Sequence, residues 1–270
     1  MAYISITNLN YDIYLNITLH NNHVNEIIIS KSLHKYLVNA KEKINKHQKD
    51  WDYYKKITNP YEYIHTPSSY TKNISVSKYK PLSRSFFKMI EIIHVFNFFA
   101  NYDNNIISFH LAEGPGGFIE AFHYNRNNKY DIYYGMTLLS DDNNVPSWKK
   151  SYNFISNKKN IKLETGASKT GDLFIKDNLL YINEKYKESI DFVTADGGFD
   201  FSIDFNNQED LSIKLIIAQV FYALILQKDK GTFVLKIFDI FKCKTIEVIF
   251  LLSNLYETVY IYKPYTSRIA

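Results

Sequence analysis

The stretch "HLAEGPGGFIEAF", residues 110–122, joins an apolar run to a segment of helical spacing through a turn with three glycines in four positions. The whole chain has only nine glycines in 270 residues, so their concentration here needs a reason. The pattern predicts a buried strand over residues 106–112, a tight turn, and a helix over residues 118–124. The turn is either a simple strand-to-helix connection or a place where Gly116 and Gly117 let the backbone approach a ligand, because a Cβ atom would clash there.

Strands and helices alternate along the chain on both sides of this turn. A helix is expected over residues 83–99, with Ser83 or Ser85 as its N-cap. The other expected strands are residues 130–138, 190–198, 231–239 and 257–264, and the other expected helices are residues 211–227 and 244–255. Strands that alternate with helices form parallel sheets, so the predicted fold class is α/β, with a doubly wound, mostly parallel sheet and helices on both faces.

The N-terminal part has a different pattern. Residues 1–30 alternate weakly between apolar and polar and predict one or two strands or an extended arm. Residues 31–57 predict a lysine-rich helix, and residues 58–70 contain the Pro and Ser of a loop. We therefore expect an N-terminal extension over residues 1–75 and the α/β domain over residues 76–270.

Composition limits the class of protein. Hydrophobic residues make up 46% of the chain, which is enough for a substantial core. The net charge of +4 fits a polyanionic partner. Cys243 is the single cysteine, which excludes an internal disulfide and indicates a reducing compartment. The longest apolar runs are too short to span a bilayer and no secretory signal is visible, so we expect an intracellular protein without membrane or metal sites.

Three predicted strand ends supply candidate site residues, because ligands bind beyond the carboxyl ends of such strands. The turn lacks the last glycine of a dinucleotide fingerprint, and Thr137 ends the second strand where an acidic ribose ligand is usual. Lys236 is expected inside an apolar strand, where an unpaired ammonium is costly. Lys88 in an apolar helix and Asp196 after a buried strand complete a possible proton-handling site, although a surface lysine, a lone helix charge and a turn-capping Asp would explain them singly.

A series of short motifs carries a family resemblance. They are "NPYEYI" (59–64), "SRSFFKM" (83–89), "EGPGGFIEAF" (113–122), "YGMTL" (134–138), "TGDL" (170–173), "ADGGFDFS" with "NQED" (195–210), "LKIFDIF" (235–241) and "YKPYTSR" (262–268). In this order the motifs resemble those of FtsJ-type ribose 2′-O-methyltransferases, most closely the cap-specific mRNA enzymes of eukaryotes and large DNA viruses. The resemblance runs from residue 59 to the C-terminus.

The resemblance implies a Rossmann-fold methyltransferase that uses S-adenosylmethionine and a Lys-Asp-Lys-Glu tetrad. Its first three members would be Lys88, Asp196 and Lys236. The implied cofactor-binding residues are Glu113, Gly114, Pro115, Gly116, Gly117 and Phe118 for the methionine and ribose portion, Thr137 and Leu138 along the ribose and adenine, Asp172 and Leu173 at the adenine, and Asp196.

The implied reaction is methyl transfer to the ribose 2′-OH of the first transcribed nucleotide of capped mRNA, from cap 0 to cap 1. Its partners would be capped mRNA and a protein of the capping machinery, and a viral source would place it in the host cytoplasm or the virion. The alternatives are 2′-O-methylation of rRNA or tRNA, and a catalytically silent RNA-binding subunit.

The expected tetrad Glu is the point of departure. In the family it follows the "KPxTSR" segment by about five residues, on a strand that inserts beside the one holding the second Lys. This chain ends at Ala270. We therefore expect a fragment or truncated product that lacks this strand. The alternatives are that another chain supplies the strand, or that the protein is a non-catalytic relative.

Overall fold

The computed structural model describes residues 3–7, 27–65, 75–100, 102, 104–142, 145–198 and 207–267. The chain forms two compact units, each built from several segments. Unit 1 contains residues 1–58, 199–213 and 237–263, and unit 2 contains residues 59–198, 214–236 and 264–270. The boundary expected between residues 75 and 76 stays a prediction.

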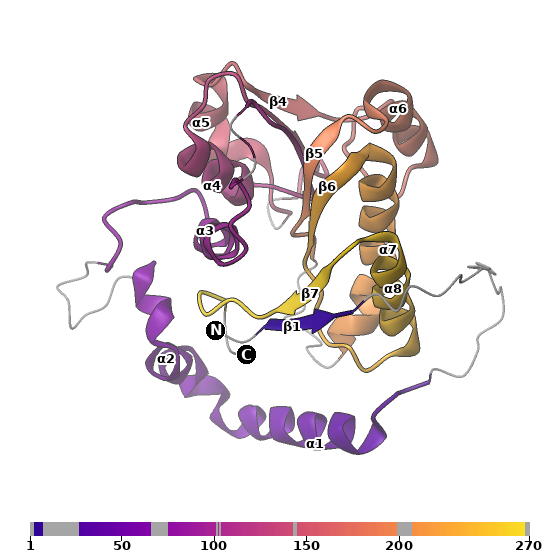
Figure 1. The fold of residues 1–270 in the computed structure, drawn as a ribbon. Helices are drawn as coiled ribbons and strands as arrows, with labels where there is room; N and C mark the ends of the chain where they lie inside the picture. The colour runs from indigo at the N-terminus through magenta and orange to yellow at the C-terminus, as the bar shows by residue number, and fades with distance from the viewer. Residues whose placement is uncertain are drawn as a thin grey trace. The chain divides into compact units, whose positions relative to one another are not determined.

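The centre of unit 2 is a five-stranded sheet in the order β4-β3-β2-β5-β6 (Figure 1). Its strands are β2 (Ile107–Leu111), β3 (Ile132–Met136), β4 (Ile161–Glu164), β5 (Ile190–Ala195) and β6 (Gln227–Leu235). Every neighbouring pair is parallel, which confirms the expected parallel sheet. The chain adds β3 and β4 on one side of β2 and then β5 and β6 on the other. The order therefore switches between β2 and β5.

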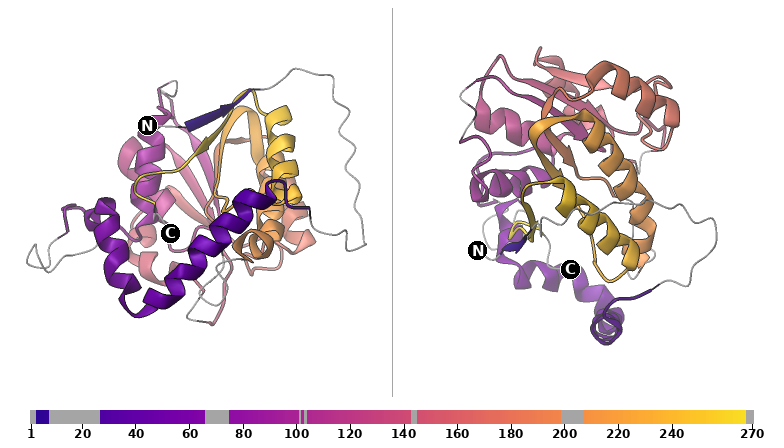
Figure 2. Two further views of the ribbon diagram at one scale, coloured as in Figure 1. Left: turned by 90° about the horizontal axis from the view of Figure 1, so that it is seen from below. Right: turned by 45° about the vertical axis from the view of Figure 1, so that its right-hand side comes forward.

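Helices cover both faces of this sheet, as the two views of Figure 2 also show. One core contains side chains of α6 (Lys176–Tyr186) and of α7 (Gln208–Leu226), and the other contains those of α3 (Ser85–Val95) and α4 (Gly117–Arg126). The alternation of side chains along β5 explains the two layers. Phe192 belongs to the core with α3 and α4, whereas Val193 belongs to the core with α6 and α7.

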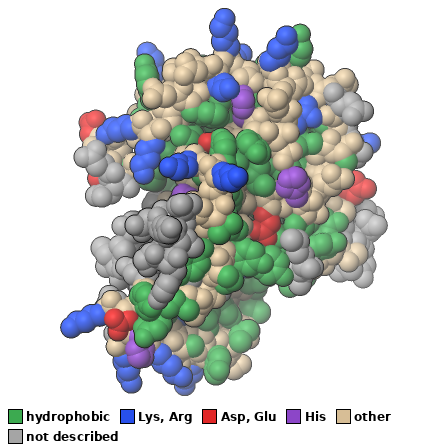
Figure 3. All heavy atoms as spheres, turned by 90° about the vertical axis from the view of Figure 1, so that its left-hand side faces the viewer, with side chains coloured by type: hydrophobic (Ala, Val, Ile, Leu, Met, Phe, Trp, Pro, Cys, Tyr) green, Lys and Arg blue, Asp and Glu red, His purple; other side chains and the backbone are tan. Residues whose placement is uncertain are grey.

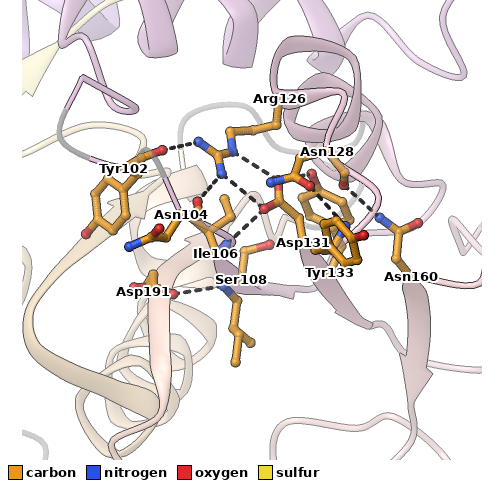
Figure 4. A network of polar contacts seen from close by, with 12 residues as sticks. Tyr102, Asn104, Ile106, Ser108, Arg126, Asn128, Asp131, Tyr133, Asn160 and Asp191 are labelled. Atoms are coloured by element: carbon orange, nitrogen blue, oxygen red, sulfur yellow. Dashed lines mark hydrogen bonds and ion pairs between the residues drawn. The ribbon is translucent and has the colours of Figure 1, made fainter.

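A buried polar network holds the amino ends of the strands (Figure 4). Asp131 is fully buried and accepts hydrogen bonds from the guanidinium of Arg126 at 2.9 Å and from the backbone N–H of Ile106 at 2.9 Å. Asp191 accepts a hydrogen bond from the N–H of Ile107 at 2.8 Å. These carboxylates satisfy strand ends that would otherwise leave donors unpaired. They lie at the edge of the sheet opposite to the carboxyl ends of the strands.

In unit 1, β1 (Tyr3–Ile6) pairs antiparallel with β7 (Val259–Tyr262), from Tyr3 opposite Tyr262 to Ile6 opposite Val259. The unit also contains α1 (Lys31–Glu42), η1 (Lys43–His47), α2 (Gln48–Thr58) and α8 (Cys243–Leu255). Lys41 of α1 forms a 2.9 Å ion pair with Asp239. The helical elements α1, η1 and α2 together confirm the expected lysine-rich helical segment. The remaining expectation for residues 8–26 lies outside the described residues.

Some local expectations need correction. Neither Ser83 nor Ser85 caps α3. Arg84 is at the N-cap position, where its guanidinium has no acceptor atom for a cap, and the two serine hydroxyls bond to each other at 2.5 Å. The strand β4 and the helix α6 were not expected, since β4 has only four residues and α6 is mostly polar. Within the described residues, no helix combines the length and apolar character needed to cross a membrane.

Candidate active site

Lys88, Asp196 and Lys236 meet at the carboxyl edge of the sheet. Lys88 Nζ lies 3.2 Å from both carboxylate oxygens of Asp196. Lys236 Nζ lies 3.1 Å from Asp196 Oδ1 and donates to the backbone oxygen of Asp196 at 2.7 Å. The three residues are separated by 108 and 40 positions in the sequence, so only the fold brings them together.

Two of the three side chains follow neighbouring strands, β5 and β6, and β5 also borders the switch in strand order between β2 and β5. Asp196 follows β5 directly, and Lys236 follows β6. The expectation that Lys236 lies inside a strand is wrong, because β6 ends at Leu235 opposite Ala195, the last residue of β5. At the strand end the ammonium can reach the carboxylate and also the solvent. Its side chain is 30% exposed.

Burial tunes the charge of Lys236. Desolvation is the main cause that lowers its pKa, and the positive charge of Lys88 lowers it further. Asp196 opposes both effects, since its carboxylate favours the ammonium form. The lysine is thus held in a place where losing its proton costs less than in water.

The Gly-rich turn is closed by Glu113. Its Oε1 accepts hydrogen bonds from the N–H groups of Phe118 at 2.7 Å and Ile119 at 3.2 Å, at the start of α4. Its backbone oxygen accepts from the N–H of Gly116 at 2.7 Å. Burial, and then the charge of Asp196, raise the pKa of Glu113 to about 8. Glu113 therefore shapes the turn through its hydrogen bonds. It also interacts electrostatically with Lys88, Asp196 and Lys236.

The three glycines of the turn have different reasons. Gly116 has a φ of 108°, which side chains rarely tolerate. A Cβ at Gly114 would lie 2.7 Å from the backbone oxygen of Pro146. A Cβ at Gly117 would collide with the hydroxyls of Ser83 and Ser85. The residues at the start of α3 fill the space beside Gly117, and this packing is enough to require a glycine there. The expected approach of a ligand to Gly117 stays a prediction.

Replacing Gly117 with alanine is expected to destabilise the fold by about 1–3 kcal/mol, the usual cost of overpacking. The reason is the collision of the new methyl group with Ser83 and Ser85. Urea unfolding of Gly117→Ala measures the loss. In a Ser83→Ala, Ser85→Ala background the same change should cost much less, and an equal cost in both backgrounds would contradict this explanation.

The other predicted cofactor-binding residues also come together at this edge. Gly171 packs directly on the backbone oxygen of Thr137, and the N–H of Leu139 donates to the oxygen of Thr170 at 2.7 Å. The "TGDL" turn is thus joined to the end of β3. Asp172 Oδ1 accepts from the N–H of Phe174 at 2.8 Å. Of the two expected leucines, Leu138 is exposed, whereas Leu173 packs in the core.

His110, within the stretch that forms the turn, takes no part in this cluster. Its ring is fully buried between the hydroxyls of Ser108 and Thr194, each at 2.8 Å. Burial lowers its pKa to about 3, so the ring is neutral at physiological pH. We interpret it as a structural residue of β2.

Sequence reasoning missed a second set of charged residues beside Lys88. Arg84 Nη1 lies 2.8 Å from Glu62 Oε2, and Glu91 accepts from the N–H groups of Tyr265 and Thr266 at 2.8 and 2.9 Å. Two of these charges were visible in the "NPYEYI" and "SRSFFKM" motifs. The signal for the third, Glu91, was its spacing. Lys88 and Glu91 follow Arg84 by four and seven positions in an otherwise apolar helix, which places the three charges on one side.

The comparison with known families assigns the class. A family model described as FtsJ-like methyltransferase matches residues 81–270. The chain therefore belongs to the FtsJ-like methyltransferase family. The match begins shortly before α3 and includes Lys88, the Gly-rich turn, Asp196 and Lys236.

Individual relatives have names of cap-specific mRNA methyltransferases, and one of them is named as inactive. The chain is 35% identical over 158 residues to the cap-specific mRNA (nucleoside-2′-O-)-methyltransferase of Autographa californica nuclear polyhedrosis virus, covering 58% of each chain. It is 32% identical over 167 residues to the cap-specific mRNA (nucleoside-2′-O-)-methyltransferase 1 of Mus musculus, covering 58% of this chain and 19% of that one. It is 28% identical over 177 residues to an inactive cap-specific mRNA (nucleoside-2′-O-)-methyltransferase 1B of Caenorhabditis briggsae, covering 62% and 20%. The matches span less than two thirds of these relatives.

FtsJ-like methyltransferases use S-adenosylmethionine, and the carboxyl edge of the sheet fits this cofactor. A Cβ at Gly116 would be in ordinary van der Waals contact with the side chains of Leu82 and Trp148, at 3.6 Å, so the positive φ and not a collision requires glycine there. The carboxyl groups of Glu113 and Asp172 contain oxygens that can accept hydrogen bonds from an ammonium, ribose hydroxyls or an exocyclic amine, and the exposed Leu138 suits an adenine ring. Among the described residues, the buried Nε1 of Trp148, whose ring lies against Gly116, has no hydrogen-bond partner.

Proposed function

We propose that this protein transfers the methyl group of S-adenosylmethionine to the ribose 2′-OH of the first transcribed nucleotide of capped mRNA, converting cap 0 to cap 1. The observation that carries the proposal is the Lys88, Asp196 and Lys236 cluster at the switch in strand order of an FtsJ-like chain. The names of the relatives supply the substrate class.

The residues divide the work of the reaction. The bound cofactor supplies an electrophilic methyl group on a sulfonium. Lys236 orients the 2′-oxygen and takes its proton, because its lowered pKa makes the neutral amine accessible. Lys88 contributes to that lowering, and Asp196 holds both ammonium groups in place. In-line placement of the oxygen and the methyl carbon accounts for much of the rate.

The cofactor-binding assignment follows the same edge of the sheet. The turn of Glu113, Gly114, Pro115, Gly116, Gly117 and Phe118 holds the methionine and ribose portion. Thr137 and Leu138 lie along the ribose and adenine, Asp172 and Leu173 bind the adenine, and Asp196 also faces the cofactor. The hydrogen bond and the close packing that join residues 170–173 to the end of β3 support assigning both segments to one cofactor site.

The partners and place of action belong to the same proposal. Capped mRNA is the substrate, and a protein of the capping machinery is a partner. The baculovirus relative supports a viral source, with action in the host cytoplasm or the virion. Lys and Arg side chains among exposed hydrophobic ones on the face in Figure 3 suit a polyanion.

Methyl transfer to matched capped and uncapped RNA tests the proposal. Transfer to the capped RNA is expected to exceed that to the uncapped RNA at least about tenfold, with the product identified as a 2′-O-methyl first nucleotide by mass spectrometry. Capped RNA with a 2′-deoxy first nucleotide is the control and should accept no methyl group. Equal transfer to capped and uncapped RNA would favour rRNA or tRNA as substrate.

A silent RNA-binding subunit is the second candidate, because an inactive relative is 28% identical. Cofactor binding without any transfer would favour it. Retention of all three charged residues supports the enzyme instead, since a silent site has no need to hold two lysines on one carboxylate.

A further inference from the structure

Three charged side chains follow one side of α3 and its N-cap position. Arg84, Lys88 and Glu91 are four and three positions apart, so they lie on the same side of the helix. Lys88 binds Asp196 in the candidate active site. The other two side chains flank it along the helix. Whatever they hold therefore lies beside the reacting groups.

Arg84 and Glu91 hold residues 265–266. Glu91 Oε1 accepts from the N–H of Tyr265 at 2.8 Å, and its Oε2 accepts from the N–H and the hydroxyl of Thr266 at 2.9 and 2.7 Å. Arg84 Nη2 donates to the backbone oxygen of Thr266 at 3.2 Å. Bonds to charged groups are the stronger kind, so this short segment is firmly placed.

The same arginine holds η2 (Pro60–Ile64) in position. Arg84 Nη1 pairs with the buried carboxylate of Glu62 at 2.8 Å. Asn59 caps η2 by accepting from the N–H of Tyr61 at 3.2 Å, and its Nδ2 donates to the oxygen of Ser267 at 3.4 Å. Two segments distant in sequence are thus tied to each other and to α3.

The outcome of this network is a pair of exposed aromatic rings. Tyr61 and Tyr265 stack with ring centroids 5.3 Å apart and an interplanar angle of 27°. Tyr61 is 41% and Tyr265 is 46% exposed, and neither belongs to a hydrophobic core of the described chain. A partly buried ion pair and a set of charged hydrogen bonds therefore present two rings to the solvent.

We propose that the stacked Tyr61 and Tyr265 pair is a platform on which a base of the substrate RNA stacks beside the candidate active site. Flat aromatic rings bind the faces of unpaired bases, and a rigid platform loses little entropy on binding. The proposal rests on the proposed function as an RNA methyltransferase. The base is either the methylated guanine of the cap or a base of the transcript, because both present the same kind of aromatic face.

The test compares Tyr61→Ala, Tyr265→Ala and the double variant with the corresponding Phe variants, which keep the rings. RNA affinity is measured by fluorescence anisotropy, the KM for RNA by methyl transfer, and cofactor affinity by calorimetry. The Ala variants are expected to lose about tenfold or more in RNA affinity with unchanged cofactor affinity, and the Phe variants should stay near the original. Tyr130→Ala is the matched control, since Tyr130 is 68% exposed and precedes β3 at the opposite edge of the sheet.

The outcomes separate this proposal from the proposed function. A loss seen with a methylated cap dinucleotide assigns the cap guanine, and a loss seen only with longer RNA assigns a transcript base. Unchanged RNA affinity and KM in the folded double variant would overturn the platform. An original chain that binds RNA through these tyrosines but transfers no methyl group would support the platform and reject the proposed function. Thermal melting of each variant shows that it is folded.

Discussion

Lys236→Ala is expected to lower methyl transfer by a factor of about 10²–10⁴, the usual contribution of a general base. The side chain is the ammonium that lies 3.1 Å from the Asp196 carboxylate at the end of β6. Its removal takes away the group that orients the 2′-oxygen and accepts its proton. Cofactor affinity, measured by calorimetry, should change little, because Lys236 is not among the residues assigned to the cofactor. Near-normal turnover would remove Lys236 from the mechanism.

Lys236→Arg separates proton acceptance from orientation. Arginine keeps the charge and can donate hydrogen bonds, but it cannot lose its proton at accessible pH. If proton acceptance matters, the Arg variant is expected to be nearly as inactive as the Ala variant. Lys214→Ala, an exposed lysine of α7, is the control and should be fully active.

The pH dependence of the rate follows from the direction of the pKa shift. Only the neutral amine accepts a proton, so the rate is expected to rise with pH and level off above the lowered pKa of Lys236. Lys88→Met removes a charge that lowers this pKa, so the rising limb should move to higher pH. Single-turnover rates across the pH range measure the rising limb of the original chain and that of the Lys88→Met variant. A limb that does not move would contradict coupling between the two lysines.

Asp196→Asn is expected to reduce both activity and stability. One carboxylate pairs with Lys88 and Lys236, and the amide would leave two partly buried ammonium groups without their ion-pair partner. Removing one partner of a fully buried pair costs about 3–5 kcal/mol. The side chains here are 15–30% exposed, so about 1–3 kcal/mol is expected after allowing for screening by solvent. Transfer should fall at least about a hundredfold, because Lys236 loses its position.

The stability loss of Asp196→Asn should shrink as the pH rises. Without the carboxylate, which opposes the lowering, the folded-state pKa of Lys236 falls further below its unfolded value. The unfolded chain then binds more protons, so the free energy of unfolding increases with pH. Urea unfolding at neutral and alkaline pH measures this trend, with the exposed Asp141→Asn as control. A pH-independent deficit would mean that the ammonium of Lys236 is not the cause.

Several parts of the fold and site were predictable from sequence, and others were not. The stretches at residues 106–112 and 190–198 predicted β2 and β5, because they are rich in apolar residues, as strands buried on both faces are. The residues of β4 and α6 lacked such a signal. Lys88 and Asp196 were singled out as charges beside apolar segments. Lys236 was predicted as a site residue because a lysine among apolar residues needs a partner, and it does pair with Asp196. Its expected place inside a strand was wrong, because β6 ends one residue earlier.

The sequence alone determined the parallel sheet and the edge at which a site forms, since the alternation of strands and helices and the rule for ligand sites are local or topological. Only the tertiary structure decided which groups meet there. It placed two lysines on one carboxylate across 108 and 40 residues, and it joined Tyr61 to Tyr265 through Arg84 and Glu62. It also showed that Gly117 makes room for α3. These contacts depend on packing between distant segments, and spacing along the chain does not encode their distances.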